Sequence, residues 1–75
     1  MNYAVKQRLV MIEFLLQQYG HVGRAELIEF FGISPAAATR DFCQYKEMAG
    51  RNLAYSETEK RYYKTQNFQP VFIGR

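Results

Sequence analysis

The sequence predicts a mainly α-helical domain that ends in a small β-hairpin, an α+β fold of three helices followed by two strands. Apolar residues recur at helical spacing in three segments before residue 50, and one apolar face on each segment is typical of helices that share a core. Beyond residue 50 the sequence changes to two short, tyrosine-rich runs on either side of a polar stretch. That pattern is typical of an antiparallel hairpin. The 75 residues suffice for one small domain.

The first helix is expected over residues 3–19, followed by a break at residues 20–23 that places His21 in a connecting loop. The side of this helix that faces the core is a stripe of apolar residues at helical spacing, with Leu15 at its edge: Val5, Leu9, Ile12, Leu16 and Tyr19. A second apolar arc points elsewhere and consists of Val10, Met11 and Phe14. On one side of the helix, polar residues separate the core stripe from this second arc, namely Lys6, Glu13 and Gln17.

The second apolar arc has two explanations. Either the carboxy-terminal tail, residues 68–73, folds back over it, or a second copy of the chain covers it, because exposed apolar patches usually have a partner. We favour the second explanation and expect a dimer contact in which the tail takes part. The residues expected at this contact are Val10, Met11, Phe14 and Phe72.

A short helix, a tight turn and a third helix are expected next. The short helix covers residues 24–31 and ends at Gly32, a residue type that adopts the backbone conformation common at helix ends. The third helix runs from Pro35 to about Ala49. Ser34 is a good N-cap for it, and Pro35 fits the first helical position, where its missing N–H costs nothing. Its core face comprises Ala38, Phe42, Tyr45 and Ala49.

The hairpin and a tail complete the chain. The expected strands are Leu53–Ser56 and residues 61–65, and the residues after them form an extended tail in which Pro70 opposes a helix. Three helices followed by a hairpin is the order of a winged helix-turn-helix. We therefore divide the chain into a winged helix-turn-helix DNA-binding domain, residues 1–66, and a tail, residues 67–75, which contacts a second copy or begins a linker to a further domain.

Composition argues against several classes of function. One cysteine and one histidine exclude an internal disulfide and argue against a protein zinc site. Neither a catalytic constellation nor a glycine-rich phosphate loop is recognisable, so we expect no enzyme, metal, cofactor or small-molecule ligand. Neither a signal peptide nor an apolar run of membrane-spanning length is present. We expect a cytoplasmic, nucleoid-associated protein without membrane contact. The net charge of +3 is compatible with a polyanionic partner but does not require one.

The outer side of the third helix carries small and polar residues around one arginine, a surface that a DNA major groove accepts. We expect Arg40 to fork onto a guanine edge; the alternatives are a solvated arginine or an ion pair with Glu47 or Glu13. Cys43 lies on the same side, and we interpret it as an inert thiol rather than a redox sensor, because nothing nearby clearly lowers its pKa.

Residues around that helix are candidates for phosphate contacts. Ser34 can both cap the helix and donate to a phosphate, and Arg24 lies at the positive dipole end of the second helix. In the hairpin, Lys60 and Arg61 can reach a minor groove or a flanking phosphate, although acidic neighbours favour a plain exposed turn almost equally. Thr39, Ala36 and Ala37 can contact a phosphate or a thymine methyl. Their small side chains also let the helix approach the DNA closely. The expected DNA contacts are Arg24, Ser34, Ala36, Ala37, Thr39, Arg40, Gln44, Lys60 and Arg61.

Two sets of motifs resemble known families. Gly32-Ile33-Ser34 followed by Ala38-Thr39-Arg40-Asp41-Phe42 resembles the turn and the Arg-Asp-Leu ending of DeoR-like winged helices. A wider set resembles the amino-terminal domain of WYL-domain transcriptional regulators, in particular the repressors that guard bacterial phage-defence loci. This wider set covers nearly the whole chain and comprises residues 24–34, Gln44-Tyr45, Asn52-Leu53-Ala54-Tyr55, Lys60-Arg61-Tyr62-Tyr63 and residues 68–72.

The resemblance implies a sequence-specific repressor that binds double-stranded DNA as a homodimer, on a palindromic operator. In that family the tail leads into a ligand-sensing domain, which this chain of 75 residues does not include. We therefore expect either the DNA-binding domain of a longer regulator or a short regulator from a phage or mobile element. The ligand-controlled derepression of that family is not carried over to this chain. The alternative is an antirepressor-like protein-interaction module that uses the winged-helix surface without specific DNA binding.

Overall fold

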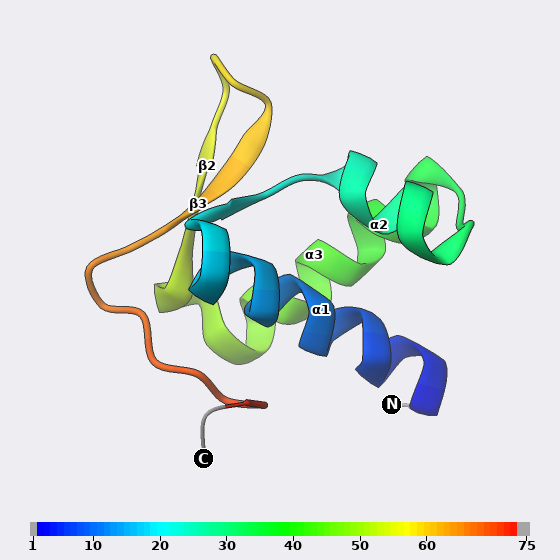
Figure 1. Ribbon diagram of the computed structural model, residues 1–75, viewed down its shortest axis with the longest axis horizontal. Helices are drawn as coiled ribbons and strands as arrows, with labels where there is room; N and C mark the ends of the chain where they lie inside the picture. The colour runs from blue at the N-terminus through cyan, green and yellow to red at the C-terminus, as the bar shows by residue number, and fades with distance from the viewer. Residues whose placement is uncertain (1, 74–75) are drawn as a thin grey trace.

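The computed structural model describes residues 2–73 of the chain, which form three helices and a small sheet (Figure 1). The helices and strands agree with the predicted order of helix, helix, helix and hairpin, and the predicted fold class is confirmed. Each predicted helix range matches the observed one. The elements are α1 (Tyr3–Tyr19), β1 (His21–Val22), α2 (Arg24–Phe31), α3 (Pro35–Ala49), the 3-10 turn η1 (Gly50–Asn52), β2 (Leu53–Ser56) and β3 (Arg61–Lys64).

The sheet contains one strand more than the sequence predicted. Its strand order is β1-β3-β2 and both pairs are antiparallel. Tyr62 lies opposite Tyr55 on one side and Val22 on the other, and His21 lies opposite Tyr63. The prediction that His21 sits in a loop was wrong, because its pairing partner is far away in the sequence and leaves no local signal. Strand β1 therefore joins the start of α2 to the base of the hairpin.

Local signals fix the helix ends. The Asn2 side chain accepts a hydrogen bond from the Val5 N–H at 2.9 Å, and Ser34 Oγ accepts from the Ala37 N–H at 3.1 Å. The predicted N-cap of α3 is thereby confirmed. Gly20 and Gly32 end α1 and α2 with φ values of 82° and 68°, a left-handed conformation that glycine adopts without steric cost.

The core lies where α1, α2, α3 and the sheet meet. The predicted stripe of α1 is buried at its centre, but Tyr19 is 67% exposed, so its assignment to the core was wrong. Tyr19 is the last residue of α1, where the chain turns away at Gly20 toward β1. The fully or almost fully buried apolar residues are Leu9, Ile12, Leu16, Val22, Leu27, Ala38, Phe42, Tyr45, Ala49 and Leu53.

Glu13 is the main departure from the predicted pattern, because its side chain is fully buried rather than solvated. Its carboxylate accepts hydrogen bonds from the Tyr45 hydroxyl at 2.9 Å and from the Val71 N–H at 2.8 Å. The N–H groups of Phe72 and Ile73 donate to its second oxygen, each at 2.8 Å. One carboxylate of α1 thus binds both α3 and the tail, which returns toward α1 after β3 (Figure 1).

Asn52 provides a second attachment for the tail and is also fully buried. Its Nδ2 donates to the Gln69 carbonyl at 2.8 Å and its Oδ1 accepts from the Gln69 N–H at 2.8 Å. The same Nδ2 lies 3.0 Å from the Tyr45 hydroxyl, so that Glu13, Tyr45 and Asn52 form one connected network. Phe68, Val71 and Phe72 pack against the core beside it, half-buried.

A second polar link joins α1 to α3. Arg8 Nε lies 2.5 Å from Asp41 Oδ2, and the Asp41 side chain is 4% exposed. Asp41 follows Arg40 in the sequence, but its side chain is buried. The ion pair therefore binds the inner face of α3 to α1. Sequence reasoning did not identify this pair, because the two residues lie 33 positions apart.

The network predicts a specific loss of stability at alkaline pH. Burial, chiefly, raises the pKa of Tyr45 above the ordinary value near 10; the bond to Glu13 adds to this, whereas the bond from Asn52 acts in the opposite direction. Above about pH 10 the unfolded chain releases a proton that the folded chain retains, so the free energy of unfolding falls as the pH rises. Urea titrations across this range should give a difference between wild type and Tyr45→Phe that shrinks with rising pH. A constant difference would contradict this assignment.

Candidate nucleic-acid interface

Three segments that are distant in the sequence meet beside the outer face of α3. The start of α2, the middle of α3 and the hairpin enclose a hollow with a cavity volume of about 270 Å³. We call this hollow the wing cleft. It is lined by Arg24, Thr39, Phe42, Tyr55, Lys60 and Tyr62.

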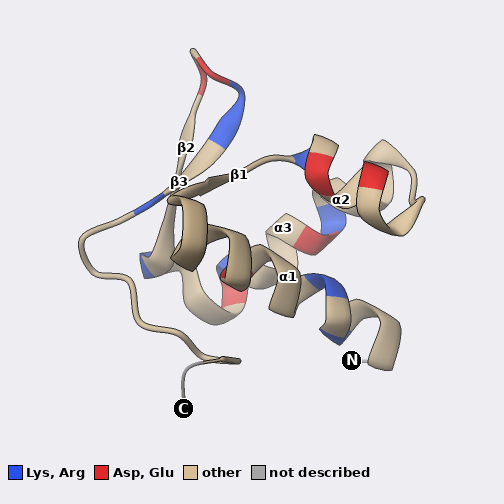
Figure 2. Ribbon diagram, in the orientation of Figure 1, with Lys and Arg blue, Asp and Glu red and all other residues tan. Residues whose placement is uncertain are grey.

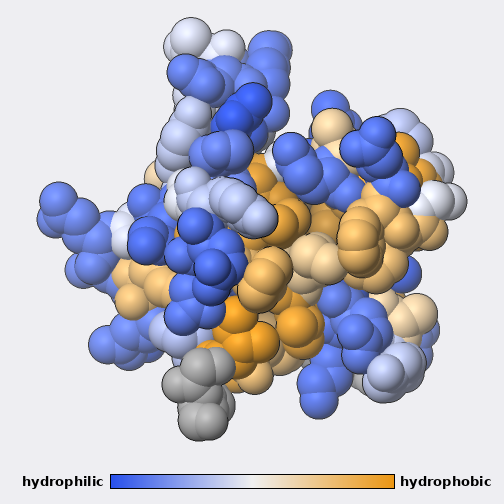
Figure 3. All heavy atoms as spheres, viewed as in Figure 1, coloured by the Kyte–Doolittle hydropathy of each residue, from blue (hydrophilic) through white to orange (hydrophobic). Residues whose placement is uncertain are grey.

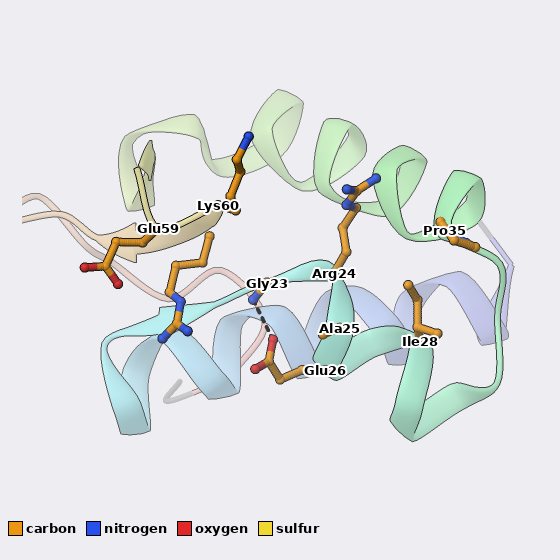
Figure 4. Close-up of a pocket in the computed structure, with 9 residues that line it drawn as sticks. Gly23, Arg24, Ala25, Glu26, Ile28, Pro35, Glu59 and Lys60 are labelled. Carbon is orange, nitrogen blue, oxygen red and sulfur yellow. Dashed lines mark hydrogen bonds between the residues drawn. The ribbon is translucent and has the colours of Figure 1, made fainter. Parts of the chain in front are cut away.

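A neighbouring depression shares two cations with the wing cleft. This depression, between the start of α2 and the hairpin turn, is also lined by Arg24 and Lys60. In Figure 4 both of these side chains extend toward α3, whereas Glu59 points away from them. The hairpin turn carries both acidic and basic residues (Figure 2), and of these Lys60 extends toward α3 (Figure 4).

Gly23 permits the close approach of α2 and the hairpin. It is buried, and its N–H donates to Glu26 Oε1 at 2.7 Å (Figure 4). A Cβ atom at this position would lie 3.3 Å from the same Glu26 oxygen and 3.5 Å from the Arg61 Cβ. An added Cβ would therefore crowd the bonded carboxylate, which would have to shift slightly, and would be in ordinary contact with the hairpin. Glycine therefore suits the close packing of the start of α2 against the hairpin, the two segments that carry Arg24 and Lys60.

Arg24 is oriented by a contact from α3. Its guanidinium donates to the Thr39 hydroxyl at 3.2 Å, and that hydroxyl donates in turn to the Pro35 carbonyl at 3.1 Å. An arginine has five N–H donors, so most of the Arg24 donors remain for another acceptor. The Thr39 hydroxyl already has two partners, and in this structure it positions Arg24.

An aromatic stack fixes the hairpin against α3. The rings of Phe42 and Tyr62 lie 4.5 Å apart and nearly parallel, and the Tyr55 ring lies 4.8 Å from that of Tyr62. Burial, chiefly, raises the pKa of Tyr62, which keeps its hydroxyl protonated. Tyr55 is 48% exposed at the mouth of the cleft, and sequence reasoning missed it. The available signal was its spacing. Tyr55 lies two residues after Leu53, so the two side chains share one face of the strand.

The outer face of α3 is available to a partner. Arg40 is exposed, and the one ion pair found among residues 2–73 is the pair between Arg8 and Asp41. The alternative pairing of Arg40 with Glu13 was wrong, because Glu13 is buried among other partners. The exposed residues of this face are Ser34, Ala36, Thr39, Arg40, Cys43 and Glu47, and half-buried Ala37 and Gln44 lie at its edge.

The hairpin presents Lys60 more directly than Arg61. Lys60 has a φ of 60° at the end of the turn, and its N–H donates to the Ser56 carbonyl at 2.7 Å. Arg61 is half-buried, and its guanidinium lies 3.2 Å from His21 Nδ1 on the neighbouring strand. Of the nine expected DNA contacts, Arg24, Thr39 and Lys60 therefore meet at the wing cleft, whereas Arg61 lies against the sheet.

Two of the four residues expected at a dimer contact line one depression. Met11 and Phe14 line an apolar depression between α1 and α2, whose cavity volume is about 370 Å³. Val10 is half-buried, and Phe72 lies with its ring 6.3 Å from that of Tyr45. Hydrophobic side chains gather over this side of the molecule in Figure 3. The residues of the apolar depression are Met11, Phe14, Leu15, Tyr19, Glu26, Glu29 and Phe30.

The part of the chain that the structure describes shows neither a metal site nor a membrane-spanning helix. Residues 2–73 contain no cluster of three or more histidine, cysteine or acidic side chains that could hold a metal ion. Within the same range, none of the helices is long and apolar enough to cross a membrane.

A short helix, a tight turn and a helix with an exposed polar face, followed by a hairpin, define a winged helix-turn-helix protein. Residues 4–75 match the family model of the BrxR transcriptional regulator winged helix-turn-helix domain. The chain belongs to this family, which confirms the predicted relationship to the winged-helix domain of transcriptional regulators.

Three relatives illustrate the similarity, and all three are named DNA-binding transcriptional repressor CapW. The protein from Escherichia coli (strain KTE188) is 37% identical over 72 residues, which are 96% of this chain and 24% of the relative. The protein from Stenotrophomonas maltophilia is 34% identical over 70 residues, 93% of this chain and 23% of the relative. The protein from Pseudomonas aeruginosa is 36% identical over 71 residues, 95% and 24% respectively. The chain thus spans about a quarter of the length of these curated relatives.

The backbone at Lys60 allows a test of how the turn is built. A left-handed conformation costs a residue with a Cβ about 1 kcal/mol relative to glycine. We therefore expect Lys60→Gly to have a higher free energy of unfolding than Lys60→Ala by about this amount, as measured by urea denaturation. Glu59 is the matched control, because its φ is not positive; there the alanine variant should be at least as stable as the glycine variant. Equal stabilities at Lys60 would contradict the observed turn.

Proposed function

We propose that this chain is the sequence-specific double-stranded DNA-binding domain of a transcriptional repressor, acting as a dimer on a palindromic operator. The observation that carries the proposal is the convergence of Arg24 and Lys60 at one cleft beside the exposed face of α3. Membership of a family of transcriptional-regulator domains supports it. The relatives named as DNA-binding transcriptional repressors support it further.

Phosphate binding is the role that suits the wing cleft. Arg24 and Lys60 supply two positive charges, and the first-turn N–H groups of α2 add the positive end of a helix dipole. Arg24 is already oriented by Thr39 at 3.2 Å, so less of its conformational freedom is lost on binding. With a phosphate held there, α3 would lie along the neighbouring major groove.

Base recognition falls to the outer face of α3. Arg40 is its exposed cation, and a guanidinium can donate two hydrogen bonds to a guanine edge. Ala36 and Ala37 allow the first turn of the helix to approach closely, and Gln44 lies one turn beyond Arg40. Ser34 keeps its hydroxyl proton for a phosphate, because its oxygen already accepts from Ala37. Arg61 takes a secondary role at the flank of the hairpin.

Selection of bound duplexes from random DNA tests this assignment. Wild type should recover a motif, and Arg40→Ala should lose about 1–3 kcal/mol of binding free energy with relaxed preference at one base position. Lys6→Ala is the matched control, since Lys6 is an exposed cation on α1; it should leave the recovered motif unchanged.

The salt dependence of binding separates DNA recognition from a protein-interaction role. A DNA-binding domain should lose affinity steeply with added salt, because phosphate contacts release counterions. The absence of saturable DNA binding even at low salt would contradict the proposal and favour the antirepressor-like module.

The dimer in this proposal uses the second apolar arc, Val10, Met11 and Phe14, together with Phe72. The apolar depression supplies an exposed part of that surface, since Phe14 is 43% exposed there. Sedimentation equilibrium should therefore show a dimer for wild type and a weaker one for Phe14→Ser, because the substitution removes apolar area from the contact. Tyr3→Ser is the control, as Tyr3 is 76% exposed on α1 but outside the depression. A wild-type monomer at all concentrations would contradict the dimer.

A further inference from the structure

The tail and α3 are hydrogen-bonded to the same buried carboxylate. Glu13 accepts from the N–H groups of Val71, Phe72 and Ile73 and from the hydroxyl of Tyr45. Three consecutive N–H groups that converge on one anion form a complementary site, because each carboxylate oxygen can accept two bonds. The tail contributes only backbone N–H groups to this site.

Release of the tail would change the surroundings of α3. Glu13 would keep one of its four donors while still lying among Leu9, Ile12 and Leu16 of the core. A buried charge without partners is strongly unfavourable, so water or a new side-chain conformation has to replace the lost bonds. Tyr45 is bonded to that carboxylate and to Asn52. The position of α3 is therefore coupled to the state of the tail.

The tail is an irregular segment at the edge of the core. Residues 65–73 contain no helix or strand, and Phe68, Val71 and Phe72 are only half-buried. Segments with few buried apolar contacts open locally at a smaller free-energy cost than the whole domain. Asn52 holds the first part of the tail at Gln69, and Glu13 is the hydrogen-bond partner of residues 71–73.

We propose that docking of residues 71–73 on Glu13 is a switch for DNA affinity, in which Glu13 is the positioning residue for α3. In the docked form Tyr45 holds the inner face of α3, and the outer face around Arg40 is preorganised for the groove. A partner that takes the N–H groups of the tail weakens DNA binding. This inference rests on the proposed DNA-binding function and adds a means of regulating it.

Glu13→Gln tests the switch, because it keeps the shape of the side chain but replaces one acceptor oxygen by a donor. Two quantities are measured: amide hydrogen exchange at Phe72 and Ile73, and affinity for a mixed-sequence DNA duplex at low salt by fluorescence anisotropy. We expect both amides to lose protection and DNA affinity to fall on the order of tenfold. Ile12→Val is the matched control; it loses a buried methyl beside Glu13 and should keep tail protection and DNA affinity.

A second variant covers the case in which Glu13→Gln does not fold. Val71→Ala shortens a half-buried side chain that packs against the core, at a residue that is not an expected dimer contact. It should also release the tail and weaken DNA binding. Either variant with an exposed tail and wild-type DNA affinity would overturn the switch, as would protected tail amides in Glu13→Gln. If wild type binds no DNA, the proposed function fails by itself. Amide hydrogen exchange of α3 in the tail-released variants then still tests the coupling between the tail and α3. Faster exchange supports the coupling, and unchanged exchange contradicts it.

Discussion

One buried carboxylate organises this fold. Glu13 lies in the middle of α1 with no solvent exposure and receives four hydrogen bonds, one from α3 and three from the tail. Removing the partners of a buried charge typically costs about 3–5 kcal/mol, a large share of the stability of a domain of this size. Glu13 therefore links α1 to the tail, and Tyr45 and Asn52 extend the same network to the end of α3.

The interface depends on that arrangement because the inner face of α3 carries its polar bonds to α1. Tyr45 and Asp41 make these bonds, whereas Arg40 on the opposite side is exposed and the neighbouring Thr39 contacts Arg24 of α2. The hairpin is held separately, by the stack of Tyr62 on Phe42. Gly23 then allows the start of α2 to approach the hairpin. A rigid inner face and a free outer face are what a helix needs to enter a DNA groove without large rearrangement.

The sequence predicted what local patterns determine. Helix ranges follow from apolar spacing, and the cap at Ser34 follows from residue chemistry. Residue chemistry also predicts Arg24, Thr39 and Lys60 as contacts, but it does not predict that they converge on one cleft. Pairings across long separations had no such signal. The partners of Glu13 lie up to 60 positions away, and Arg61 contacts His21 across 40. For that reason the burial of Glu13, the first strand and the exposure of Tyr19 had to come from the structure.

The central claim is that the outer face of α3, the start of α2 and the hairpin form one DNA-binding surface. A nuclear magnetic resonance titration of the chain with a short DNA duplex measures this directly, because each backbone amide reports separately. The account predicts that the largest shift changes cluster at Arg24, along the outer face of α3 around Arg40, and at Lys60. Changes confined to the apolar depression around Phe14, or no changes at low salt, would contradict it.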